Sequence, residues 1–230
     1  MCKRKVISLA EVKLEEFLRV VGEIFPNQIN VEEGEHQYDE YLGHREVWDD
    51  FSSIDKEKVQ TVVMQFLNKW QCRLPYKYAS ELTEALRKVE PLLKPLRNLS
   101  IEDADLLASV NVEGKTIKVL ELIEQVFSIV QRVKAGRRTV GFTATSKILH
   151  MAIPTFFVMC DEKIRKAYGC EGNAAGYGNF MLRMSILARD LLTQAKGNKG
   201  IILSCSKWKG RTLARLLDNF NYTKFTRKKA

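Results

Sequence analysis

Residues 140–169 read VGFTATSKILHMAIPTFFVMCDEKIRKAYG and carry the most informative pattern in the chain. A turn at Gly141 precedes a segment with helical periodicity, Pro154 ends that segment, and an apolar run from Phe156 to Cys160 follows. Asp161 comes directly after this run and opens the next predicted helix. A carboxylate at the end of a segment that should be buried is either a helix cap or a catalytic group.

Helical periodicity also dominates on both sides of this stretch. The pattern predicts helices at about 8–25, 53–70, 80–89, 115–134, 143–152, 161–168, 178–195 and 207–219, with a short one from Ser100. Ser8 and Glu11 form a capping box for the first of them. The only strand-like run is Ile201–Cys205, and the glycine-rich stretch 169–178 is predicted to be a flexible connection. The sequence therefore predicts an all-α fold.

Residues 26–52 are predicted to form a long acidic loop, with eight acids against Arg45 alone. Its aromatic residues argue against disorder, since disordered segments are poor in aromatics. His36, Asp39 and His44 could be drawn as a metal site, but their irregular spacing favours a lid-like loop. We therefore predict no metal and no other cofactor.

The charge is divided unequally along the 230 residues. Residues 131–230 hold 20 Lys and Arg against 5 Asp and Glu, whereas residues 1–130 hold 17 against 23. A basic half of this size is typical of a protein that binds a polyanion, although a solvated basic surface without a partner is the alternative.

Cysteine usage and hydropathy indicate the compartment. The five cysteines are scattered and form no CxxC pair, which favours reduced thiols in a cytoplasmic protein. No apolar run approaches about 18 residues, and the N-terminus lacks a signal-peptide pattern. We expect a protein without a membrane span.

The stretch that begins at Val140 resembles the helix-hairpin-helix DNA glycosylases of base-excision repair. Val140-Gly141 stands where the hairpin of that family ends, Ile148 and Leu149 fall on the buried helix face, and Phe156–Met159 forms the apolar approach. Asp161 lies 20 residues after Gly141, at the position of the family's catalytic aspartate. The resemblance covers about 30 residues and implies two packed helical subdomains, which we place at 1–110 and 111–230.

The chain also departs from the family pattern. Thr139 replaces the first hairpin glycine, and Thr143 stands where bifunctional members carry a lysine. The family's cysteine cluster is absent. Lys147, one helical turn further along the same face, is the nearest candidate for a Schiff-base nucleophile.

The resemblance assigns roles to several residues. A carboxylate at Asp161 would stabilise the positive charge that develops on the sugar, or activate the attacking water. Backbone N–H groups near Gly141 and Thr143 would hold a DNA phosphate. The cations expected to add to this site are Arg137, Arg138, Lys147, Lys163 and Arg165.

Three aromatic residues are candidates for a base pocket or wedge. Tyr76 and Tyr78 lie in a basic-aromatic stretch and could stack on an extruded base or fill a helix junction, and Trp48 lies in the acidic segment. His150 lies among apolar residues and is predicted to be a hydrogen-bonded core residue rather than a ligand.

The sequence thus predicts a monomeric DNA glycosylase that acts on a damaged or modified base in duplex DNA. Because Thr143 replaces the lysine, we expect it to be monofunctional. Two rival interpretations remain. One is a nucleic-acid-binding module without catalysis, and the other is a metal-dependent nuclease that uses the acidic segment.

Overall fold

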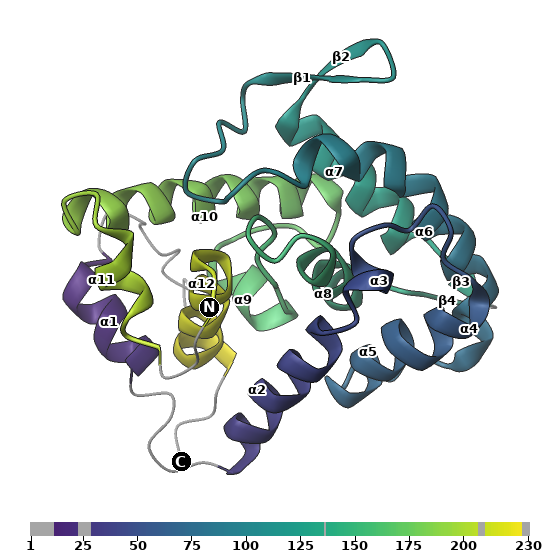
Figure 1. Ribbon diagram of the computed structural model, residues 1–230, viewed down its shortest axis with the longest axis horizontal. Coiled ribbons are helices and arrows are strands. Elements are labelled where there is room, and N and C mark those ends of the chain that lie inside the picture. Colours follow the sequence, from purple (N-terminus) through teal and green to yellow (C-terminus); the bar gives the residue numbers. More distant parts are fainter. Residues whose placement is uncertain (1–11, 23–28, 136, 207–209, 227–230) are drawn as a thin grey trace, which may run out of the picture.

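The computed structural model describes residues 12–22, 29–135, 137–206 and 210–226, and they form a mainly helical body (Figure 1). The longer helices are α1 (Leu14–Gly22), α2 (Ile29–Leu42), α6 (Ala79–Leu93), α7 (Val119–Gln131), α8 (Phe142–Ala152), α10 (Ala174–Gln194) and α12 (Leu213–Asn221). The shorter ones are α3 (Arg45–Trp48), α4 (Lys56–Lys58), α5 (Gln65–Lys69), α9 (Glu162–Ala167) and α11 (Lys199–Leu203). The turns η2 (Val59–Met64), η3 (Tyr76–Tyr78), η4 (Lys94–Leu96) and η5 (Tyr222–Thr226) connect or extend them. The all-α class predicted from the sequence is confirmed.

Buried hydrophobic side chains from both halves of the chain form one cluster. The boundary expected between residues 110 and 111 falls within strand β1 (Ser109–Val112). Among the described residues, no helix combines the length and the apolar character needed to cross a membrane. The capping box at Ser8 and Glu11 lies outside the described residues.

Helices α7 and α10 pack against each other near the N-terminal end of α10. A Cβ atom at Gly178 would lie only 2.6 Å from the Glu124 carboxylate and 3.1 Å from the Leu120 side chain. The Asn173 side chain caps α10 by accepting a hydrogen bond from the backbone N–H of Gly176 at 2.8 Å. The prediction that 169–178 is only a flexible connection is therefore wrong, because residues 174–178 belong to α10 and Gly178 lets this helix approach α7.

Helices α7 and α8 are joined by a short hairpin. Strand β3 (Lys134–Ala135) pairs antiparallel with β4 (Arg138–Thr139), and the backbone N–H of Val140 donates to the carbonyl of Val133 at 3.0 Å. Gly141 has a φ of 81° and a ψ of 172°, a region that essentially only glycine occupies. The chain therefore has helix, hairpin and helix in the predicted order.

The prediction of a loop over residues 26–52 is wrong where the structure describes the chain. Residues 29–42 form α2 and residues 45–48 form α3. Two acids of α2, Glu35 and Asp39, are ion-paired with Arg211 and Arg215 near α12. These ion pairs neutralise acids of α2 with arginines that are distant in the sequence, so no local sequence pattern could predict them.

The prediction of a strand at Ile201–Cys205 is also wrong. Most of this run belongs to α11, with Ile202 fully buried and Ile201 exposed. A short apolar run cannot distinguish strand from helix by periodicity alone. The longest strands are instead β1 and β2 (Lys115–Lys118), which form a hairpin that projects from the helical body (Figure 1). Glu113 and Gly114 at its tip both have positive φ, as a two-residue hairpin turn requires.

Candidate functional site

The apolar segment 156–160 approaches Asp161 as a buried, extended chain. It pairs with no strand, so its backbone polar groups need other partners. On α8, the Ser146 hydroxyl accepts a hydrogen bond from the Cys160 N–H at 3.1 Å and lies 3.0 Å from the Cys160 carbonyl, to which it can donate. Helix α8 thus fixes the residue immediately before Asp161.

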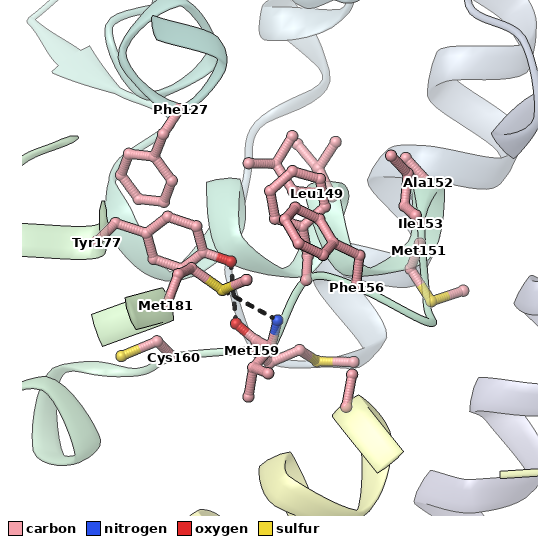
Figure 2. Close-up of a cluster of buried hydrophobic side chains, with 14 of the residues drawn as sticks. Phe127, Leu149, Met151, Ala152, Ile153, Phe156, Met159, Cys160, Tyr177 and Met181 are labelled. Atoms are coloured by element: carbon pink, nitrogen blue, oxygen red, sulfur yellow. Dashed lines mark hydrogen bonds between the residues drawn. The ribbon is translucent and has the colours of Figure 1, made fainter. Parts of the chain in front are cut away.

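Helix α10 holds the same segment from the other side (Figure 2). The Tyr177 hydroxyl donates to the carbonyl of Val158 at 3.0 Å, and the N–H of Val158 lies 3.5 Å from the Met181 sulfur. The Tyr177 ring stacks on Phe127 of α7, with ring centroids 4.2 Å apart. Side chains of α8 and α10 therefore replace the sheet partner that the segment lacks.

His150 of α8 also hydrogen-bonds to this segment. Its Nδ1 lies 2.6 Å from the carbonyl of Phe157, which can only accept, so Nδ1 carries the proton. Its Nε2 accepts from the Tyr38 hydroxyl at 2.9 Å. Burial lowers the pKa of His150 to about 3, so the ring is neutral. The prediction of a hydrogen-bonded core histidine is confirmed.

Asp161 is the N-cap of α9 and is partly exposed. Its Oδ1 accepts hydrogen bonds from the backbone N–H groups of Lys163 at 2.8 Å and Ile164 at 2.9 Å. Its Oδ2 accepts from the Thr226 hydroxyl at 2.6 Å. Asp161 is therefore a helix cap, one of the two roles that the sequence allowed, and its carboxylate has a fixed orientation.

The N-terminus of α8 lies at the end of the α7–α8 hairpin and is capped by no side chain. Gly141 and Thr143 are partly exposed there, while Arg137 and Arg138 on the hairpin are exposed. Arg165 of α9 lies over the ring of Phe142, 5.9 Å from its centroid. Arg165 therefore lies at a helix N-terminus without a side-chain cap, and Arg137 and Arg138 lie on the hairpin that leads into it.

The other predicted cations are engaged by protein groups. Lys163 Nζ donates to the carbonyl of Thr226 at 3.1 Å, and Arg165 donates to the carbonyl of Cys170 at 2.7 Å. Lys147 Nζ donates to the carbonyl of Trp70 at 2.7 Å and lies 3.6 Å from the Cys72 sulfur. In this arrangement Lys147 fastens α8 to the loop after α5.

The three aromatic candidates are separated by the fold. Trp48 is completely buried, and its indole N–H donates to the carbonyl of Tyr41 at 2.7 Å. Tyr78 is also buried, so neither ring faces an incoming base, and these two assignments are corrected to core residues. Tyr76 is 52% exposed, and its turn η3 lies beside β3 of the α7–α8 hairpin.

A buried charge cluster between α2 and α12 was missed by the sequence analysis. Arg215 donates to Glu35 at 2.5 Å and to Asp218, and its guanidinium lies 4.4 Å from the centroid of the Tyr38 ring. Arg211 binds Glu35 at 2.8 Å and holds Asp39 through two hydrogen bonds. The sequence signal was weak, because Arg215 and Asp218 are spaced like an ordinary exposed helical pair.

The cluster extends electrostatically toward Asp161. Burial raises the pKa of Asp218 to about 6, and the neighbouring cations Arg215 and Lys147 oppose this rise. Glu35 and Asp161 raise it further. Asp218 is therefore close enough to both Lys147 and Asp161 to respond to their charges.

Two surface hollows lie away from Asp161, which is itself partly exposed. One surface hollow lies on α4 and α6 and another at the end of α10, and neither is lined by Asp161 or Lys147. Within the described ranges, no three His, Cys, Asp or Glu side chains are grouped as metal ligands would be. No protein-family model, curated protein or solved structure matches this chain.

Proposed function

We propose that the protein is a DNA glycosylase that hydrolyses the N-glycosidic bond of a damaged or modified base extruded from duplex DNA. The observation that carries the proposal is the connection between hairpin and carboxylate. Helix α8 begins at the positive-φ Gly141, and its Ser146 and His150 hold the segment that ends at Asp161. This order of parts resembles the helix-hairpin-helix glycosylases, to whose fold we assign the chain as part of the proposal.

The chemistry requires a carboxylate beside the sugar. Breaking the bond builds positive charge on the deoxyribose, which a fixed anion stabilises, or the anion activates the attacking water. The two backbone N–H groups on Asp161 Oδ1 and the N-terminus of α9 stabilise negative charge at this position. Lys147 donates to the Trp70 carbonyl, which supports hydrolysis without a lysine nucleophile.

The DNA would lie on the hairpin side of the molecule. The open N–H groups at the start of α8, with Arg137 and Arg138 beside them, suit a backbone phosphate. Tyr76 is exposed next to the same hairpin and could enter the base stack. Glu35 and Asp39 of α2 bind arginines, which disfavours the rival nuclease built on that segment.

A product assay tests the proposal. The protein is incubated with duplexes that carry different base modifications, with and without a divalent metal ion. The proposal predicts a free base and an alkali-labile abasic site from at least one duplex. Binding without product would indicate a non-catalytic module, and a metal-dependent phosphodiester break would indicate the nuclease.

A further inference from the structure

The chain segment 222–226 (η5) donates a hydrogen bond to Oδ2 of Asp161, the carboxylate oxygen that does not cap α9. Two backbone N–H groups already orient the carboxylate through Oδ1, so the bond from Thr226 to Oδ2 adds little to its orientation. The Thr226 hydroxyl oxygen lies 2.6 Å from Oδ2, which is where a water molecule activated by the carboxylate would lie. In this conformation the Thr226 hydroxyl takes the place of that water on Oδ2.

This segment contacts α12, α9 and α1 through partly exposed side chains. Lys163 binds the carbonyl of Thr226, and the ring of Phe225 meets the ring of Tyr168 edge-on at 5.6 Å. Lys224 pairs with Glu16 at 2.9 Å, but both side chains are about a third exposed and such pairs stabilise weakly. Because no residue of η5 is buried, this segment should open at a lower free-energy cost than the core helices.

We propose that residues 222–226 form a C-terminal strap that closes Asp161 in the DNA-free protein and leaves its carboxylate before base release. The proposal rests on the proposed glycosylase function of Asp161. In the proposed closed state the Thr226 hydroxyl occupies Oδ2 until substrate and water replace it.

Thr226→Val removes the hydroxyl with little change in shape, and Thr223→Val is its matched control. The Thr223 hydroxyl lies on the same strap and has no hydrogen-bond partner in the described part of the chain. Hydrogen–deuterium exchange of the DNA-free proteins measures opening of the strap. Backbone amides of 222–226 should exchange about tenfold faster in Thr226→Val, because a hydrogen bond to a charged group is lost. Thr223→Val removes a buried hydroxyl without a partner and should exchange no faster than the wild type. A Thr226→Val protein that also exchanges no faster than the wild type would overturn the proposal.

The reaction provides the second readout. At saturating protein, single-turnover base release should be roughly three- to tenfold faster in Thr226→Val than in wild type, since a weaker strap opens more often. Thr226→Ser should restore the wild-type rate. A slower Thr226→Val would mean that the hydroxyl assists Asp161, which contradicts a strap. If the proposed function fails, no variant releases a base, and the exchange measurement still decides whether the strap exists.

Discussion

At the scale of single residues, the positive φ of Gly141 orients the first N–H groups of α8, which are the proposed DNA contact. An added Cβ would meet only the Thr139 carbonyl, at 3.9 Å, so a substitution is penalised by its backbone conformation rather than by crowding. Gly141→Ala should lower the free energy of unfolding by about 1–3 kcal/mol. It should also weaken DNA binding in a titration, because the N–H groups at the start of α8 would turn away from the phosphate.

Gly114→Ala is the matched control for this effect. Gly114 has a φ of 82°, and an added Cβ would have no neighbour within 4 Å, but the residue lies at the tip of the β1–β2 hairpin. This variant should lose stability and keep its DNA affinity. Equal losses of affinity in both variants would show that the Gly141 turn has no special place in binding.

His150 should make stability depend on pH. The unfolded ring takes up a proton near pH 6.5, whereas burial keeps the folded ring neutral down to about pH 3. The unfolded state therefore binds more protons in this window, and stability falls as the pH falls. Relative to His150→Gln, the wild type should lose about 1.4 kcal/mol per pH unit between pH 6.5 and 4.5 in urea denaturation. A constant difference between the two proteins would mean that the folded ring is protonated.

Among site residues, the sequence predicted those with local signals. Asp161 was placed at a helix N-terminus because it ends an apolar run, and the need for glycine at 141 followed from the turn. The hydrogen bonds of Ser146 and Tyr177 to the backbone of segment 156–160 could not be predicted. Their partners are backbone groups that come near only after α8 and α10 have packed.

At the scale of elements, the α7–α8 hairpin is the predicted phosphate contact. Arg138→Glu should weaken DNA binding and reduce the salt dependence of log Kd by roughly one phosphate contact. Lys196→Glu is the control with the same charge change. Lys196 follows α10, whose end toward α11 lies on the opposite side of the view from β3 and β4 (Figure 1). Equal losses in the two variants would point to nonspecific attraction by the net charge.

The elements that were predicted wrongly depend on distant partners. Helix α2 packs through its buried Tyr38 and Tyr41 and through Glu35, which meets two arginines about 180 residues later. The run at Ile201–Cys205 is short, and within the described residues it pairs with neither of the two small sheets. Helices with long apolar faces, such as α7 and α8, were located to within a few residues.

At the scale of the whole molecule, the two oppositely charged halves of the sequence meet at the α2–α12 cluster. Arg211 and Arg215 form ion pairs with Glu35 there, so part of the positive charge of residues 131–230 neutralises acids of the first half. The exposed cations of the hairpin remain for a polyanion. Net charge by itself therefore overstates the DNA-binding surface, and the position of each cation must be known from the fold.

The central claim is that the charge of Asp161 drives base release, and Asp161→Asn tests it most directly. The asparagine carbonyl can keep the cap to Lys163 and Ile164, and its amide can face the Thr226 hydroxyl. Only the negative charge is lost. On a duplex that the wild type processes, the single-turnover rate of base release should fall by at least about 10²-fold, while Kd for DNA and Tm change little. An Asp161→Asn variant that releases the base at the wild-type rate would contradict the account and leave Asp161 as a helix cap.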